Sequence, residues 1–189
     1  AWDAAPRTNA AGAIYDDMWN VVGTYDDQVD NYGQEHTQLH YRYSNLFGGT
    51  FAAALHHTAG AGYYEEYNQG SVMGLSFMDF GLMPYYTASG DTVGYGDVVT
   101  RKWLDNDFYG ATSSWTYENG GQRVQLGGGV HRYEGAHFGR VIWANNPNVS
   151  TLDGEYYTGD AVKDDANIYA KYAVTSNNLL VYADAQYRY

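Results

Sequence analysis

The chain has 189 residues and a formal net charge of −12, an acidity that argues against nucleic-acid binding, because phosphate recognition needs clustered lysine and arginine. Tyrosine accounts for 21 residues and glycine for 23, a composition that suits the aromatic belts of a membrane barrel better than a dry soluble core. No run of about 18 apolar residues occurs, which excludes a transmembrane helix and leaves a soluble protein or a membrane protein built from strands.

The first candidate element is the segment 18–25, interpreted as an additional strand within an external loop. After it, six stretches alternate between apolar and other side chains with a period of two residues, which predicts β-strands. These stretches are 35–43, 47–57, 107–117, 123–131, 166–174 and 179–189. One face carries apolar side chains, among them Leu39, Leu55, Leu126, Ile168 and Val181. Each stretch has about 9 to 11 residues, the length of a tilted strand that crosses a bilayer.

The connections between these stretches alternate between short and long. Short, turn-rich links fall at 44–46, 118–121 and 175–178, and long connections fall at 58–106 and 133–164. Outer-membrane barrels have this layout, with tight periplasmic turns and long extracellular loops. The sequence therefore predicts an all-β fold, an antiparallel transmembrane β-barrel section of about six strands.

Charged residues occupy the face opposite the apolar one and indicate a wide, wet barrel interior. They are Arg42, Arg123, Lys171, Asp184 and Arg188. Aromatic residues crowd the short-turn ends of the apolar face, as in a membrane girdle: Tyr43, Phe47, Trp115 and Tyr117. Six strands cannot close a bacterial barrel, whose smallest single-chain form has about eight. We therefore expect the chain to be a section of a longer polypeptide, or its edges to pair with something else.

Several blocks of the sequence resemble TonB-dependent outer-membrane receptors, especially those of the Bacteroidota type. The blocks are AWDAAP (1–6), DDQVDNYGQEHTQLHYRY (26–43), ALHHTAGAGYYEEY (54–67), RKWLDNDFYGATSSWTYEN (101–119), LGGGVHRYEGAHFGRVIWA (126–144) and NIYAKYAVTSNNLLVYADAQYRY (167–189). The most distinctive parts are WLDNDFYG (103–110) and GxHFGxVIWA (135–144).

The resemblance implies a barrel of roughly 22 strands, of which residues 1–189 would be a middle section of one barrel domain, without a plug domain. It further implies import of a scarce nutrient, such as an iron chelate, haem, cobalamin or a glycan, across the outer membrane of a Gram-negative bacterium. The implied partners are outer-membrane lipid and lipopolysaccharide, the remainder of the barrel and its plug, TonB through an N-terminal region missing here, and surface lipoproteins. Two alternatives remain: a complete small barrel with a structural or adhesive role, and a secreted β-sandwich that binds carbohydrate.

The long loop 62–99, within the connection 58–106, is the candidate for ligand contact, because exposed aromatic clusters often mark binding sites. The candidate residues are Tyr63, Tyr64, Tyr67, Phe77, Phe80, Tyr85 and Tyr86. The alternative is an ordered loop that packs on itself or on its neighbours.

The histidines are interpreted as polar lumen residues, and no metal site or cofactor is expected. Neighbours on a strand point to opposite faces, so His56 and His57 cannot readily bind one ion together. His36 and His40 share a face but lie about 13 Å apart at the strand rise. The pair His131 and His137 is placed at the mouth of a loop and interpreted in the same way.

No catalytic residue is expected, and the chain is not interpreted as an enzyme. The sequence has no nucleophile elbow, no HExxH helix and no phosphate loop. Ser113 and Ser114 fall in the middle of a predicted strand, with no histidine in obvious reach across the sheet.

Overall fold

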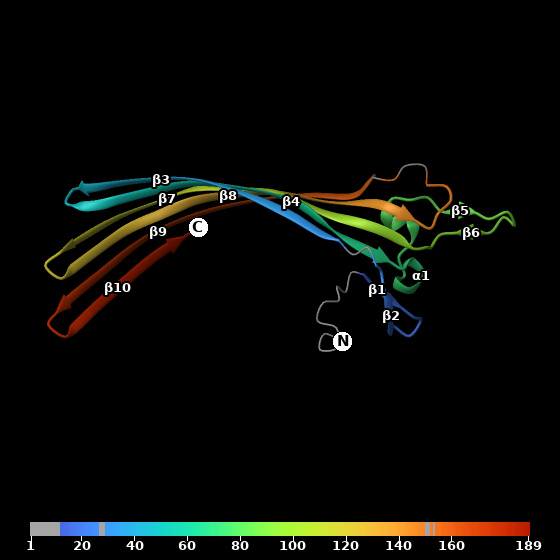
Figure 1. The fold of residues 1–189 in the computed structure, drawn as a ribbon, viewed down its shortest axis with the longest axis horizontal. Coiled ribbons are helices and arrows are strands. Elements are labelled where there is room, and N and C mark those ends of the chain that lie inside the picture. The colour runs from blue at the N-terminus through green and yellow to red at the C-terminus, as the bar shows by residue number, and fades with distance from the viewer. Residues whose placement is uncertain (1–11, 27–28, 150–151, 153) are drawn as a thin grey trace. The chain divides into compact units, whose positions relative to one another are not determined.

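The structure is a computed structural model that describes residues 12–26, 29–149, 152 and 154–189; block 1–6 of the family resemblance lies outside them. Six long strands form one antiparallel sheet in the order β10-β9-β8-β7-β4-β3 (Figure 1). The strands are β3 (Asp30–Leu46), β4 (Gly49–Asn68), β7 (Val98–Asn119), β8 (Gln122–Ala144), β9 (Glu155–Ser176) and β10 (Leu179–Arg188). All six predicted strands are thus confirmed, in a simple meander whose two edges are β3 and β10.

The chain divides into two compact units, and each is described by itself. The turn unit comprises 34–60, 106–135 and 161–189, and it contains the three short turns of the sheet. The loop unit comprises 1–33, 61–105 and 136–160, and it contains both long connections. Figure 1 shows the three short turns, β3–β4, β7–β8 and β9–β10, at the same end of the turn unit.

Five of the six strands are longer than the alternating stretches that predicted them, and β10 ends one residue before its predicted end. β4 continues from the predicted end at 57 to Asn68, and β7 begins at Val98 rather than at 107. The connection predicted at 58–106 is therefore only 69–97, and the one predicted at 133–164 is only 145–154. Period-two hydrophobicity marks a strand only where one face is apolar, and in these extensions polar and aromatic side chains occur on both faces.

The predicted turn positions are close but shifted. The first link, predicted at 44–46, lies at 47–48, where Phe47 and Gly48 adopt positive φ angles of 49° and 77°. The second and third turns lie at 120–121 and 177–178, inside the predicted links. Asn177 has a φ of 50°, a left-handed conformation that asparagine tolerates better than most residues.

The pairing of β9 with β10 shows that the sheet has two different faces. Ile168 lies opposite Tyr187, and Val174 lies opposite Val181. On the other face, Tyr169 lies opposite Gln186, and Lys171 lies opposite Asp184. Directly opposed residues in a sheet project from the same face, so apolar side chains gather on one face of this hairpin and polar ones on the other. The predicted division of faces is confirmed for this pair of strands.

The long connection in the loop unit folds around a small core of its own. It contains α1 (Gly70–Met73), the 3-10 helix η2 (Phe77–Phe80) and the hairpin of β5 (Tyr85–Tyr86) and β6 (Thr92–Val93). The buried residues of this loop core are Phe77, Phe80, Val98 and Val141. Ser76 is the N-cap residue of η2. Its hydroxyl and its main-chain N–H both donate hydrogen bonds to Asp79 Oδ2, at 2.8 and 2.7 Å. This capping holds the pKa of Asp79 below its usual value, because the ionised carboxylate accepts both hydrogen bonds.

The segment predicted as a seventh strand forms part of a separate hairpin in the loop unit. β1 (Ala13–Tyr15) pairs with β2 (Val21–Thr24) in a two-stranded sheet, so residues 18–25 do not add to the six-stranded sheet. Tyr25 stacks on Tyr67 at a ring distance of 5.6 Å, which packs the end of the hairpin segment against β4. Among the residues described, no helix is long and apolar enough to span a bilayer.

Candidate functional site

The apolar face of the turn unit is open to its surroundings. The five marker residues of this face, Leu39, Leu55, Leu126, Ile168 and Val181, have exposed fractions between 46% and 66%. A soluble protein rarely exposes a continuous apolar surface of this kind without a partner. The face is therefore a candidate site for contact with something apolar.

A row of polar residues ends this apolar face on the side away from the short turns. His57 Nε2 lies 2.6 Å from Asp107 Oδ1, and the His57 ring contacts the Tyr109 ring at 6.3 Å. On β8 and β9, Arg132 Nε lies 2.7 Å from Glu134 Oε1, and its Nη1 lies 3.6 Å from Asp164 Oδ1. We call these residues the ionic row: His57, Asp107, Arg132, Glu134 and Asp164.

Aromatic residues lie at the turn end of the same face. Trp115 and Tyr117 stack at a ring distance of 6.0 Å, and Trp115 Nε1 donates a hydrogen bond of 2.8 Å to the carbonyl oxygen of Leu46. The apolar face of the turn unit thus has aromatic rings at one end and the ionic row at the other.

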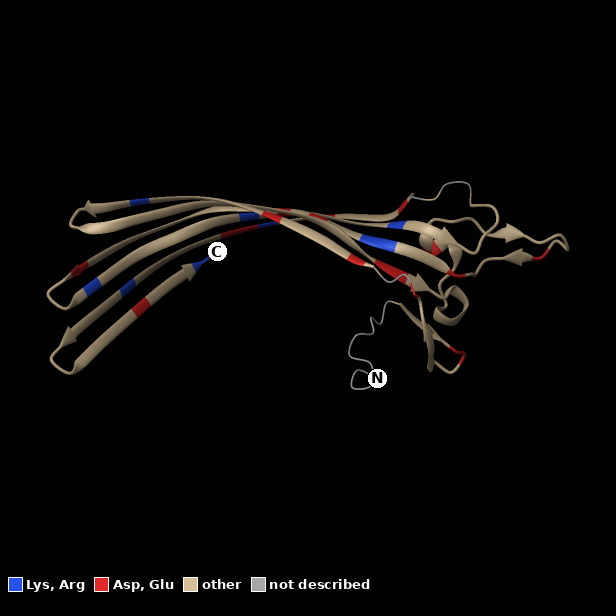
Figure 2. Ribbon diagram, in the orientation of Figure 1, with Lys and Arg blue, Asp and Glu red and all other residues tan. Residues whose placement is uncertain are grey.

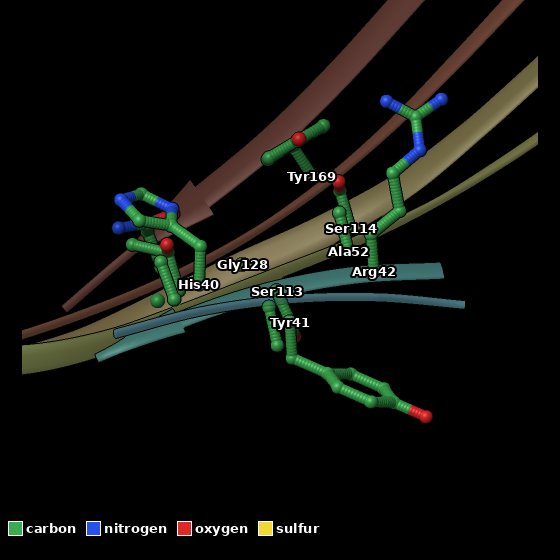
Figure 3. Close-up of a pocket in the computed structure, with 13 residues that line it drawn as sticks. His40, Tyr41, Arg42, Ala52, Ser113, Ser114, Gly128 and Tyr169 are labelled. Carbon is green, nitrogen blue, oxygen red and sulfur yellow. The ribbon is translucent and has the colours of Figure 1, made fainter. Parts of the chain in front are cut away.

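The polar face of the turn unit carries an open groove of about 530 Å³ (Figure 3). His40 and Arg42 rise on the groove side of the sheet, and Tyr41 points to the opposite side. Ser114 also lines the groove, while His40 Nε2 lies 3.0 Å from Gln38 Oε1. The alternation predicted for 35–43 is therefore seen directly in the side chains.

A second groove, of about 370 Å³, lies in the loop unit and is rich in tyrosine. We call it the tyrosine groove. Its lining includes Asp30, Tyr32, Tyr64, Lys102, His137 and Tyr157. Its floor includes Gly62, where a Cβ atom would come within 2.2 Å of the carbonyl oxygen of Asn31. Only glycine allows β3 and β4 to approach this closely.

The charge in the tyrosine groove is locally balanced. Lys102 Nζ lies 2.6 Å from Glu66 Oε2 and 5.8 Å from the centroid of the Tyr64 ring. Beside it, Arg101 Nη2 lies 2.8 Å from the buried Glu65 carboxylate, so both signs of charge meet on β4 and β7 (Figure 2). Burial raises the pKa of the Tyr157 hydroxyl above its usual value. The groove offers aromatic faces and hydroxyl groups, and its net charge is small, which suits an uncharged polar ligand.

The structure distributes the seven predicted ligand-contact residues over four places. Tyr63 and Tyr64 line the tyrosine groove. Tyr67 donates a hydrogen bond of 2.6 Å to Asp97 Oδ2. Phe77 and Phe80 lie in the loop core with exposed fractions of 0% and 6%, so the alternative of a loop packed on itself describes these two residues.

The last two predicted residues lie on the β5–β6 hairpin. Tyr85 packs on Phe77 at a ring distance of 6.3 Å, whereas Tyr86 is 73% exposed. Of the seven predicted residues, Tyr63 and Tyr64 in the tyrosine groove and the exposed Tyr86 are thus the ones placed to meet a ligand.

Sequence reasoning predicted only Tyr63 and Tyr64 of the tyrosine groove and missed its other lining residues, among them Tyr32, Lys102, His137 and Tyr157. Tyr32 precedes the first alternating stretch, and Lys102 was placed inside a loop. His137 was placed at a loop mouth, yet it and His131 both lie within β8. The available signal was the density of tyrosine on both sides of each predicted long connection.

The described residues contain no group of three or more histidine, cysteine or acidic side chains arranged to hold a metal ion. A pair of histidines does meet in the turn unit, where His56 Nε2 lies 3.0 Å from His131 Nδ1.

Comparison of the chain with protein-family models, curated proteins and solved structures found no match. Function must therefore be argued from the two faces of the sheet and its grooves.

Proposed function

We propose that the chain is a section of an outer-membrane β-barrel and belongs to a TonB-dependent receptor that imports a scarce nutrient. The observation that carries the membrane part is the apolar face of the turn unit, which is exposed and bounded at both ends. The receptor part is supported by the sequence blocks 103–110 and 135–144 and by the two long connections in the loop unit.

The height of the apolar face matches the hydrocarbon layer that a barrel crosses. Along β7, ten residues separate Asp107 in the ionic row from Tyr117 at the turn end. Ten residues of strand extend about 33 Å at about 3.3 Å per residue. A tilt of about 45° reduces this to roughly 23 Å across the bilayer, close to the apolar band of about 25 Å in outer-membrane barrels.

The two edge strands support a larger barrel as the complete structure. β3 and β10 border the sheet, and nearly all of their residues are exposed. An unpaired strand edge in hydrocarbon leaves backbone N–H and C=O groups without hydrogen-bond partners. Each such group costs about 4 kcal/mol. In our proposal, further strands of the barrel pair with both edges.

The ligand contacts of this receptor would come from the loop unit. The tyrosine groove and the exposed Tyr86 provide aromatic surface there. The polar face of the turn unit, with His40, Arg42 and Lys171, would line the wet interior. A sandwich would instead need a second large sheet over the apolar face, and the exposure of Leu39 and Ile168 favours lipid as the covering medium.

The membrane assignment can be tested residue by residue, because the chain contains no cysteine. Single-cysteine variants at 167, 168, 169 and 170 would be introduced into the intact protein and labelled with a thiol-reactive fluorophore. After reconstitution, quenching by spin-labelled lipids should be strong at 168 and 170 and weak at 167 and 169, because alternate positions face opposite sides. Equal quenching at all four positions, or a stable monomer in buffer without detergent, would refute the membrane assignment.

The receptor assignment needs a separate observation. The coding sequence upstream of residue 1 should encode a plug domain in frame with this barrel section. If the protein inserts into membranes but no plug domain is encoded, the barrel assignment stands and the receptor assignment is wrong. The protein would then be a small structural or adhesive barrel.

A further inference from the structure

His56 and His131 meet across an intervening strand of the turn unit. They lie on β4 and β8, and β7 runs between these strands. Strands two places apart are separated by about 9.6 Å, yet His56 Nε2 lies only 3.0 Å from His131 Nδ1. The Phe108 ring of β7 flanks both imidazoles, at ring distances of 5.0 and 5.7 Å.

Two glycines clear the space in which the rings meet. A Cβ atom on Gly110 of β7 would come within 2.6 Å of His131 Nδ1, and one on Gly129 would come within 2.9 Å of His131 Nε2. A side chain at either position would displace the His131 ring. The meeting of the two imidazoles therefore depends on residues of three strands, His56 on β4, Gly110 on β7, and Gly129 with His131 on β8.

The separation of the two nitrogens matches that of two ligands on one metal ion. Nitrogens bound at about 2.0–2.1 Å are about 2.9 Å apart at a right angle and about 3.4 Å apart at the tetrahedral angle. The observed 3.0 Å is close to the right-angle value, which square-planar Cu²⁺ and Ni²⁺ prefer. Imidazole is a favoured ligand for both ions.

A groove of about 470 Å³ lies beside His131. Its lining includes the charged side chains of Lys163, Asp165 and Arg188, and Asp165 is the carboxylate among them. Without metal, one of the two facing nitrogens donates its hydrogen to the other in a hydrogen bond. Binding requires each imidazole to be neutral, with its hydrogen on the other ring nitrogen. This change of tautomer releases no net proton.

We propose that His56 and His131 form a two-imidazole site for a divalent transition-metal ion of the Cu²⁺ or Ni²⁺ type on the polar face of the turn unit. The site requires the fold of the turn unit but not the receptor function. If no metal ion binds to these histidines, the membrane assignment is unaffected. If the membrane assignment is wrong, the metal site is likewise unaffected.

The test uses the intact protein without a histidine tag, stripped of metal with a chelator and titrated with Cu²⁺ alone. We expect one ion per chain to bind more tightly than the rest, with an electron paramagnetic resonance spectrum that shows coupling to two imidazole nitrogens. His56→Ala and His131→Ala should each weaken binding at least about tenfold, because one imidazole loses the advantage of a preorganised pair. Changing both should add little to either single loss.

Gly129→Ala provides a variant that retains both histidines. The atom nearest to its Cβ would be His131 Nε2, at 2.9 Å, so the added methyl group should displace the imidazole and weaken binding in the same direction. The matched controls are His36→Ala, on the polar face of β3 with a 2.8 Å contact to Thr58, and His137→Ala, in the tyrosine groove. Both controls should bind Cu²⁺ like the wild type.

Three results would overturn the proposal. One is a wild-type spectrum without coupling to two imidazole nitrogens, which decides the matter even if the variants fail to fold. Another is unchanged affinity in His56→Ala and His131→Ala. The third is an equal loss in the two controls, which would indicate adventitious binding at scattered histidines.

Discussion

Ala170 of β9 lies directly opposite Ala185 of β10 on the apolar face, and the next pair along, Lys171 with Asp184, lies on the polar face with its charged atoms 3.6 Å apart. In the proposed barrel, adjacent residues of β9 therefore face different media: Ala170 faces lipid and Lys171 faces the aqueous interior. This relationship gives the most direct energetic test of the fold.

Ala170→Arg should destabilise the protein in a bilayer by about 2–4 kcal/mol, the cost of a cation on the lipid face near the midplane. Ala170 is exposed, so the same change in a water-soluble protein would shift stability by only about 0.5 kcal/mol or less. The measurement is urea unfolding in lipid vesicles. Gln186→Arg, on the polar face opposite Tyr169, is the control and should remain close to wild type.

Trp115→Phe tests the aromatic end of the apolar face. The change retains a large ring but removes the indole N–H that donates to the Leu46 carbonyl oxygen at 2.8 Å. We expect a loss of about 1 kcal/mol in the free energy of unfolding, the usual net value of such a hydrogen bond. Tyr41→Phe, which removes a hydroxyl from the same face, should cost less, and an equal or larger loss there would contradict this role for Trp115.

Phe77→Ala should loosen the long connection in the loop unit. Phe77 is fully buried in the loop core, and truncating a buried phenylalanine costs about 3–5 kcal/mol. Limited proteolysis should show new cleavage between 69 and 97, with the six-stranded sheet still protected. The neighbouring Met78 is 66% exposed, so Met78→Ala should be cleaved no faster than wild type.

Alkaline pH should destabilise the loop unit through Tyr67. Burial, together with the hydrogen bond to Asp97, raises the pKa of Tyr67 to about 12 from its usual 10.0. Between these two pH values the unfolded state has lost this proton and the folded state has kept it, so unfolding becomes more favourable as pH rises. The stabilisation is complete below pH 10 and is lost as the pH passes about 12. Near-ultraviolet circular dichroism should follow this change, and Tyr67→Phe should remove that part of the pH dependence.

If the proposed receptor function holds, Tyr64→Ala in the tyrosine groove and the double change Tyr85→Ala with Tyr86→Ala should each reduce ligand uptake by the intact protein. An aromatic platform contributes about 1.5 kcal/mol to binding beyond its buried area, which corresponds to about a tenfold change in affinity. Uptake would be measured in cells that require the imported nutrient for growth. Tyr41→Ala, on the apolar face, is the matched control. Normal uptake in the loop and groove variants would remove these tyrosines from the proposed site.

The strands and turns were predictable because their physical causes are local. Alternation along 166–174 and 179–189 predicts which side chains share a face, and the register of β9 with β10 has this division. The extent of the strands was not predictable. Beyond His57 the apolar face ends, and residues 61–68 continue as strand because they pair with a neighbour, which single-sequence periodicity does not report.

The sites were less accessible to sequence reasoning because they join residues distant in the chain. His56 and His131 are 75 positions apart, and their meeting depends on Gly110, whose significance appears only when β7 lies between them. Phe77 and Tyr86 have similar aromatic character in the sequence, yet one is enclosed and the other exposed. Burial depends on which way the loop folds back, and composition alone carries no information on that.

The loop core described above has a consequence for how this protein can change over time. Phe77, Phe80, Val98 and Val141 hold the backbone of the long connection from within. The outward residues of the same segment, such as Met83 and Tyr86, therefore carry little of its folding energy. Substitutions at its exposed positions can therefore give this loop a new recognition surface, while its backbone conformation stays the same.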